Sequence, residues 1–289
     1  MSEVYYDLSD PKHGMNYRWV QPPQVAYFVT TMDKHGNPNA APVTLGTCVS
    51  ADMVAEETGN YYFTFSLGYT DLPLAEARQS SKNLAEVPEC VISYIGAHLF
   101  KEAQVASLPL PRGINEIDVM GLTPLPSKKV SPPGIKECKV NLEARIEWSM
   151  NVGKFYRLFL AQIVGVSVDE EMVEADSESY HHGGIYGLDP LFEYTALGGN
   201  EGPARIHTIR LDPSTAKGLS GDIGPRRSFV GTFENWLEDE VNRGALTDED
   251  RTRIIELNEQ WQANRDAKTN GAVKEELTQR LRALIPPEA

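Results

Sequence analysis

The chain has 289 residues, of which 41% are hydrophobic and 24% charged, the composition of a globular protein with a sizeable core. Its net charge of −14 and its scattered lysines and arginines argue against a nucleic-acid partner, because phosphate backbones are bound by concentrated basic faces. No apolar run approaches the ~20 residues that span a bilayer and no secretory signal opens the chain, so we expect no membrane partner.

The cysteines also bear on the cell compartment. Cys48, Cys90 and Cys138 are odd in number, far apart and without any Cys-x-x-Cys pair. This pattern fits reduced thiols better than a disulfide framework or a zinc site. We therefore expect a cytoplasmic protein.

The first regular stretch is a predicted β-hairpin at 25–50. An apolar run over 25–31 and a polar turn over 33–37 precede a second arm made of small residues, hydroxyls and one thiol. Few large side chains lie in this arm, so its backbone is open to a flat polar ligand. An ordinary loop with an edge strand accounts for the composition equally well.

The middle of the chain alternates β-prone runs with turn signals. A helical pattern over 71–87 stops at Pro88, a helix also fits 98–107, and a Pro/Lys/Ser loop over 123–134 should be exposed and irregular. Strands are predicted at 60–67, 90–95, 140–148 and 155–168, the last with a bulge or bend at Gly165. Strands outnumber helices without regular alternation, which predicts a mainly β fold, a β-barrel or sandwich with inserted helices.

The pattern changes around residue 205, after one more expected strand at 205–211. Thr232 and Thr247 stand where helix N-caps are expected, and apolar residues then recur at helical spacing up to Pro286. We expect a barrel domain over 1–205 and a helical C-terminal extension over 206–289 that covers the barrel or a partner subunit.

The usual nucleotide and hydrolase motifs are absent, since no GxGxxG follows a strand and there is no Walker lysine, HExxH or GxSxG. We predict no metal site, because the adjacent His181 and His182 lie in a glycine-containing loop and neighbouring side chains seldom converge on one ion. Phosphate-binding groups occur in the arm over 39–50 and in RQSSKN at 78–83. Taken alone, the second stretch is better explained by solvated helix charges, because Arg78 and Lys82 lie four positions apart on one helical face.

Five pieces of sequence, taken in order, resemble the flavin reductase-like family of FMN-binding split barrels. The resemblance covers roughly residues 20 to 205. The pieces are VAYFVTTMDKHGNPNAAPVTLGTCVS at 25–50, RQSSKNLAEVPECVISYI at 78–95, the segment at 110–148 with Glu116, Gly121-Leu122-Thr123 and Cys138, LFLAQIVGVSVDEE at 158–171 and TALGGNEG at 195–202.

The resemblance implies a homodimeric flavoprotein with FMN near the subunit interface. One group of residues would border the isoalloxazine and the ribityl chain: Asn39, Ala41, Pro42, Val43, Thr44, Thr47, Cys48, Val49 and Ser50. The phosphate would be held by Arg78, Ser80 and Ser81. No acid–base residue is identified.

The implied function is that of an FMN-dependent oxidoreductase of the flavin reductase type. NAD(P)H would reduce the bound flavin, and electrons would pass to free flavin, a partner oxygenase or a small organic acceptor. Pro23-Gln24, Met53 and Ala196 stand where the family often has Arg-Pro, Pro and Arg. The missing arginines, with the His181-His182 loop and the helical tail, keep open an FMN-dependent oxygenase or oxidase acting on a dedicated small molecule. A non-catalytic flavin- or haem-binding protein is a further alternative.

Overall fold

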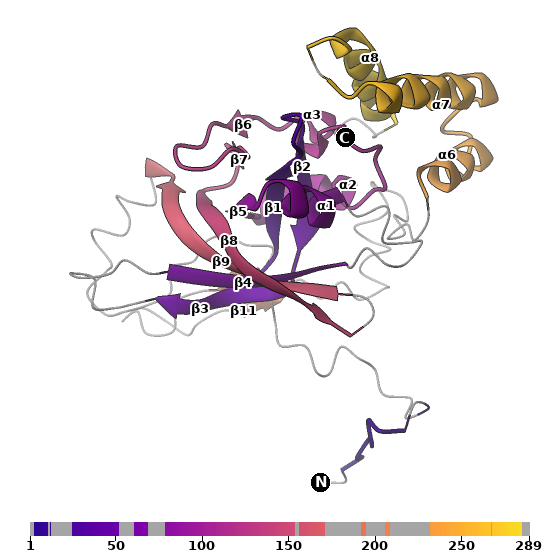
Figure 1. Ribbon diagram of the computed structural model, residues 1–289. Coiled ribbons are helices and arrows are strands. Elements are labelled where there is room, and N and C mark those ends of the chain that lie inside the picture. Colours follow the sequence, from indigo (N-terminus) through magenta and orange to yellow (C-terminus); the bar gives the residue numbers. More distant parts are fainter. Residues whose placement is uncertain are drawn as a thin grey trace.

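The main sheet has seven antiparallel strands in the spatial order β2-β1-β5-β8-β9-β4-β3. The computed structural model describes residues 3–10, 12, 25–51, 61–68, 79–153, 156–170, 192–194, 206–208, 232–266 and 268–284. The strands are β1 (Tyr27–Met32), β2 (Pro38–Val43), β3 (Gly46–Ala51), β4 (Tyr61–Gly68), β5 (Glu89–Tyr94), β8 (Val140–Val152) and β9 (Tyr156–Val168). Figure 1 shows β8 and β9 curving through the sheet, so that β3 and β4 run crosswise below β1 and β2. This curled half-barrel confirms the predicted mainly β split barrel.

The curvature of β8 and β9 has a local cause. Their register shifts twice, between Glu143 and Ala144 and between Ile146 and Trp148. Each shift leaves one residue unpaired, which bends a strand and increases its twist. Gly165 pairs with Glu143 beside the first shift, so the irregularity predicted at this glycine is confirmed.

The predicted hairpin at 25–50 is confirmed for its first half and corrected for its second. β1 pairs with β2 from Tyr27 opposite Val43 to Met32 opposite Pro38. Because β1 begins at Tyr27, opposite Val43, the residues after Val43 have no β1 residue to pair with. The chain turns away and continues as β3, which pairs with β4 at the other edge of the sheet. The small-residue arm therefore forms two strands.

The barrel core lies inside the curl of the sheet. Phe65 stacks on Phe159 and Tyr27 meets Phe63 edge to face, each with ring centroids 5.2 Å apart. Gly46 is needed beside this core, because a Cβ there would overlap the Tyr27 hydroxyl and the Thr64 carbonyl. This close approach lets β3 begin against the aromatic cluster.

Short helices and two small sheets complete the barrel region. The elements are α1 (Gln79–Glu86), η3 (Ala97–Leu99), α2 (Phe100–Val105), α3 (Glu116–Met120), β6 (Pro124–Leu125) paired with β7 (Gly134–Ile135), and β10 (Phe192–Tyr194) paired with β11 (Ile206–Thr208). α1 occupies the described part of the helix predicted at 71–87, and β11 lies within the predicted strand at 205–211. No helix in the described ranges combines the length and apolar character needed to cross a bilayer.

The loop at 123–134 is more regular than the sequence suggested. β6 and β7 pair across it, and the buried Glu143 carboxylate accepts hydrogen bonds from Lys128 N at 2.9 Å and Lys129 N at 2.6 Å. Only the ends of the loop are regular, and the residues from 126 to 133 are irregular and partly exposed, as predicted. The Glu143 side chain in β8 supplies hydrogen-bond partners that this irregular backbone lacks locally.

The C-terminal extension, defined here as α6, α7 and α8, shares a second core with the barrel region. Its bounds are α6 (Phe233–Asn242), α7 (Asp248–Ala263) and α8 (Gly271–Ala283). The predicted caps are confirmed, since Thr232 Oγ1 accepts from Asn235 N and Thr247 Oγ1 accepts from Asp250 N. The second core joins Val105, Leu110, Ile114 and Val119 to Phe233, Trp236, Leu237, Leu246, Ile254, Leu257, Trp261, Leu277 and Leu281. In Figure 1 the extension lies beyond α2 and α3. The predicted boundary at residue 205 falls outside the described residues and stays a prediction.

Candidate functional site

The first turn of α1 lies against β2, and a buried hydrogen bond joins them. Ser80 Oγ donates to Asn39 Oδ1 at 2.9 Å, while Asn39 Nδ2 donates to Glu116 Oε1 at 3.2 Å. We orient the Asn39 amide in this way because its oxygen then also accepts from Ala40 N at 3.2 Å, a hydrogen bond that the reverse orientation lacks. Two of the predicted cofactor-binding residues, which lie 41 positions apart in the chain, therefore meet in space.

Glu116 is a buried carboxyl group behind this contact. It opens α3 after the N-cap Asn115, and its Oε2 accepts from Ala40 N at 2.8 Å. Burial raises its pKa to about 8, although the Ala40 N–H acts in the opposite direction. The carboxyl is therefore mostly protonated at neutral pH. Sequence reasoning placed Glu116 in a family motif and gave it no role, because nothing local signals its contact with β2.

The side chains in the first turn of α1 are held by the surrounding structure. Ser81 Oγ donates to Gly68 O at 2.9 Å. The Gln79 amide donates to Leu110 O and accepts from Gly113 N, both at 2.9 Å. The main-chain N–H groups of a first helical turn have no carbonyl partner within the helix and favour an anion. This turn thus combines fixed side chains with N–H groups suited to a phosphate.

β3 contributes to a mixed row of side chains across one face of the sheet. Thr47 pairs with Thr64, Thr64 with Leu160, and Leu160 with Trp148. Directly paired residues in antiparallel strands point to the same face, so these four side chains are neighbours. Trp148 is 43% exposed and Thr47 is also exposed. The row therefore offers hydroxyl and apolar groups together on an accessible surface.

The residues predicted to border the flavin differ in accessibility. Asn39 and Val43 are buried, Ala41 and Pro42 are half-buried, and Thr44, Thr47, Cys48 and Val49 are exposed, while Ser50 pairs with Tyr62. Val43 packs in the barrel core. The exposed members lie from the end of β2 into β3, which is where a ligand can reach the backbone.

Several predicted features lie outside the described residues. They are Arg78, the His181-His182 pair, the departures at Pro23-Gln24, Met53 and Ala196, and the Gly198-Gly199 motif. Cys48, Cys90 and Cys138 form no disulfide, and Cys48 is exposed. Burial raises the pKa of the Cys90 thiol to about 12, so this thiol stays protonated.

A groove of about 520 Å³ lies elsewhere, between α3 and α8. Its walls include Asp118, Gly121, Lys274, Glu275 and Arg282. None of the predicted cofactor-binding residues lines it. The groove is polar and open, and we do not assign the flavin to it.

Relatives with similar sequences are found in bacteria. The uncharacterized protein BH2278 of Halalkalibacterium halodurans is 27% identical over 196 residues, covering 67% of this chain and 87% of that protein. The uncharacterized protein YwrF of Bacillus subtilis is 25% identical over 183 residues, covering 62% of this chain and 82% of that protein. The matched lengths approximate the barrel region.

Solved structures share the fold at lower identity. Nitrilotriacetate monooxygenase component B from Bacillus cereus aligns with a TM-score of 0.55 and 22% identity, covering 70% of this chain and 100% of that chain. The 2-nitrobenzoate 2-nitroreductase NbaA of Pseudomonas fluorescens aligns with a TM-score of 0.51 and 17% identity, covering 72% of this chain and 95% of that chain. The model of the flavin reductase like domain matches residues 21–189, more than half of the sequence. Fold, motif order and this match agree: the chain belongs to the flavin reductase-like family.

Proposed function

We propose that this protein is an FMN-dependent oxidoreductase of the flavin reductase type, which takes hydride from NAD(P)H and passes electrons onward. The observation that carries the proposal is the contact between Asn39 and Ser80. It brings the first turn of α1, a candidate anion site, beside β2, and the exposed part of the small-residue arm begins where β2 ends at Val43. FMN needs this combination, because a phosphate lies at one end of the molecule and a flat polar ring at the other.

The phosphate end would be bound by the first turn of α1. Its main-chain N–H groups supply hydrogen bonds, and Arg78 adds a guanidinium just before the helix. Ser80 and Ser81 support this site indirectly, since their hydroxyl protons go to Asn39 and to Gly68 O. We therefore propose that these serines fix the turn and that the N–H groups and Arg78 contact the phosphate.

The ring end would lie over the stretch from Thr44 to Ser50, where Thr44, Thr47, Cys48 and Val49 are exposed. Thr47 and Cys48 offer polar groups there, and no large side chain of β3 blocks the backbone. When bound, FMN supplies hydride chemistry at its ring, and the protein orients the ring and shields it from water. Glu116 behind Asn39, neutral at its raised pKa, would place no negative charge beside the bound flavin.

A second copy of the chain would complete the site. Trp148 is 43% exposed and Met150 is 53% exposed, and Tyr156 at the neighbouring end of β9 is exposed as well. The row that contains Trp148 continues to Thr47, so a partner that covers the apolar residues also reaches the proposed ring site. Such a patch is costly in water and supports a homodimer. Light scattering tests this: a monomeric wild-type protein refutes it.

For the electron acceptor we propose three classes of molecule. Component B of nitrilotriacetate monooxygenase supports delivery to a partner oxygenase, and the nitroreductase supports reduction of a small organic molecule. Free flavin is a third acceptor. We place the enzyme in the cytoplasm, where NAD(P)H is present and cysteines outside disulfides remain reduced.

A visible absorption spectrum tests the function directly. Purified protein should gain a flavin spectrum on adding FMN, and NAD(P)H should bleach it without air. Bleaching that requires an organic substrate would instead favour the specialised oxygenase or oxidase. Tight flavin binding without turnover under any reductant would favour a non-catalytic binding protein. Protein that gains no flavin absorbance would refute the flavin reductase, the specialised oxygenase or oxidase, and the flavin-binding protein alike.

A further inference from the structure

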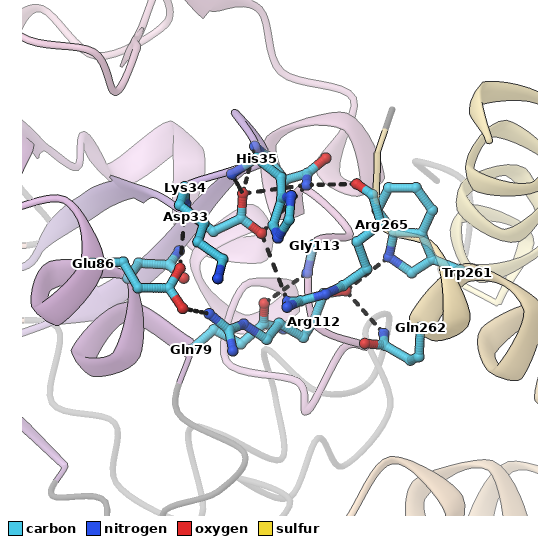
Figure 2. Close-up of polar contacts among 12 residues, drawn as sticks. Asp33, Lys34, His35, Gln79, Glu86, Arg112, Gly113, Trp261, Gln262 and Arg265 are labelled. Carbon is cyan, nitrogen blue, oxygen red and sulfur yellow. Dashed lines mark hydrogen bonds and ion pairs between the residues drawn. The ribbon is translucent and has the colours of Figure 1, made fainter. Parts of the chain in front are cut away.

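A chain of hydrogen bonds runs from the C-terminal extension to the first turn of α1. Trp261 Nε1 donates to Arg112 O at 2.8 Å, and Gln262 Nε2 donates to the same oxygen at 2.9 Å. The next residue, Gly113, donates its N–H to Gln79 Oε1 at 2.9 Å. Figure 2 shows how these residues lie one after another in space, with α7 on one side and α1 on the other. The loop at 110–113 thus connects the extension to the proposed phosphate site.

Packing reinforces this connection. Trp261 is fully buried, and Gly113 has a φ of +82°, a conformation that glycine adopts without strain. A Cβ at Gly113 would lie 3.0 Å from Cζ2 of Trp261. The indole therefore rests directly on the loop backbone, and the loop cannot shift without moving the ring.

Further contacts hold the neighbouring turn between β1 and β2. Arg265 lies 3.7 Å from the buried Asp33 carboxylate, and its carbonyl accepts from Asn37 Nδ2 at 3.1 Å. Lys274 Nζ donates to Asn37 Oδ1 at 3.1 Å. The extension is thereby attached to both elements that form the site, the β1–β2 hairpin and α1.

The side chain of Arg112 closes the network on α1. Its guanidinium donates to Glu86 Oε1 at 2.7 Å, near the C-terminal end of that helix. Gln79, at the other end, binds the loop through both its amide atoms. One loop therefore contacts both ends of α1 and sets the direction of its axis.

We propose that Trp261 and Gln262 are positioning residues for the flavin phosphate, acting through the 110–113 loop and Gln79. The inference rests on the proposed function, because it takes the first turn of α1 as the phosphate site. Main-chain N–H groups bind an anion only when the turn is held in place, and the extension holds it. The extension thus serves the cofactor without touching it.

The test compares the binding of FMN with that of a flavin without a phosphate. Dissociation constants of FMN and of riboflavin, which lacks the phosphate, are measured by fluorescence quenching for the wild type, Trp261→Phe and Gln262→Leu. Each variant should weaken FMN binding about three- to tenfold, the loss expected for one hydrogen bond, and leave riboflavin binding unchanged. Gln262 is exposed, so its variant keeps the packing even if the change at Trp261 harms folding.

Trp236→Phe is the matched control. Trp236 is also buried in the extension, but its Nε1 donates to Glu240 Oε1 at 3.0 Å, within α6 and not to the 110–113 loop. It should bind both ligands as the wild type does. Any of three results would overturn the proposal. The first is that the test variants lose equal affinity for FMN and riboflavin. The second is that the control loses as much FMN affinity as they do, and the third is that FMN affinity is unchanged in every variant.

Amide hydrogen exchange separates this inference from the proposed function. In the protein without flavin, Trp261→Phe should accelerate exchange at Gly113, whose N–H donates to Gln79, and in the second turn of α1, whose N–H groups donate to the carbonyls of the first turn. Trp236→Phe should leave both unchanged. Wild-type protein that binds neither ligand refutes the proposed function and the phosphate role with it. If the wild type binds neither ligand but Trp261→Phe still accelerates amide exchange as expected, the structural link between Trp261 and α1 exists without a phosphate role. If exchange is unchanged, that structural link is refuted as well.

Discussion

Replacing Glu116 by glutamine should flatten the pH dependence of folding stability. The Glu116 carboxyl is buried, and its pKa rises from an ordinary 4.5 to about 8. Folding therefore strengthens proton binding. The stability gained is fully present below pH 4.5 and is lost as the pH rises through about 8. At about 1.36 kcal/mol per pH unit, this difference corresponds to at most about 5 kcal/mol.

Glutamine should fit the same position. Its Oε1 can accept from Ala40 N, as the carboxyl does, and the Asn39 amide can reverse to accept from its NH₂. Ser80 Oγ would then accept from Asn39. The variant therefore keeps a hydrogen-bonded site and lacks a group that titrates.

Urea unfolding at intervals from pH 5 to pH 9 measures the effect. The wild type should lose stability relative to Glu116→Gln with a slope of up to about 1.4 kcal/mol per pH unit. Glu147→Gln, at an exposed position in β8, is the control and should follow the wild type. Parallel curves for the wild type and Glu116→Gln would refute the reasoning.

Three further predictions concern the site and its support. Leucine at both Thr47 and Ser50 should abolish FMN binding while leaving a folded dimer, and unchanged flavin content would mean that the ring lies on another strand. Arg78→Ala should weaken FMN binding by about ten- to a hundredfold with little effect on riboflavin; equal loss of both ligands would contradict a phosphate contact. Gly113→Ala should lower the free energy of unfolding by about 1–3 kcal/mol through strained backbone and crowding. Gly153→Ala, at a φ of +61° with open space around it, should cost less in the same urea titration, and equal costs would argue against the crowding.

Most strands were predictable because their signals are local. The β-prone run at 60–67 corresponds to β4 at Tyr61–Gly68, and the run at 155–168 corresponds to β9 at Tyr156–Val168. Glycine and turn residues bound these runs, so neighbouring residues alone define them. The helix caps at Thr232 and Thr247 were predictable for the same reason.

What the sequence did not reveal depends on contacts between distant segments. The division of the 39–50 arm into β2 and β3 follows from where β1 begins, at Tyr27 opposite Val43. Glu116 reaches Ala40 across 76 positions, and Trp261 reaches Arg112 across 149. Neither contact leaves a periodic or compositional trace. The contact between Asn39 and Ser80 is intermediate, because family resemblance grouped the two residues and only the structure shows how they touch.

The second core also has a consequence for how the chain is made. Val105, Leu110, Ile114 and Val119 leave the ribosome well before α6, α7 and α8, which bury them. Until Leu281 has been synthesised, the nascent barrel carries this apolar surface uncovered. A premature stop after the barrel region would thus release a protein with an exposed apolar surface that is prone to aggregate. Chaperones and proteases would recognise this surface.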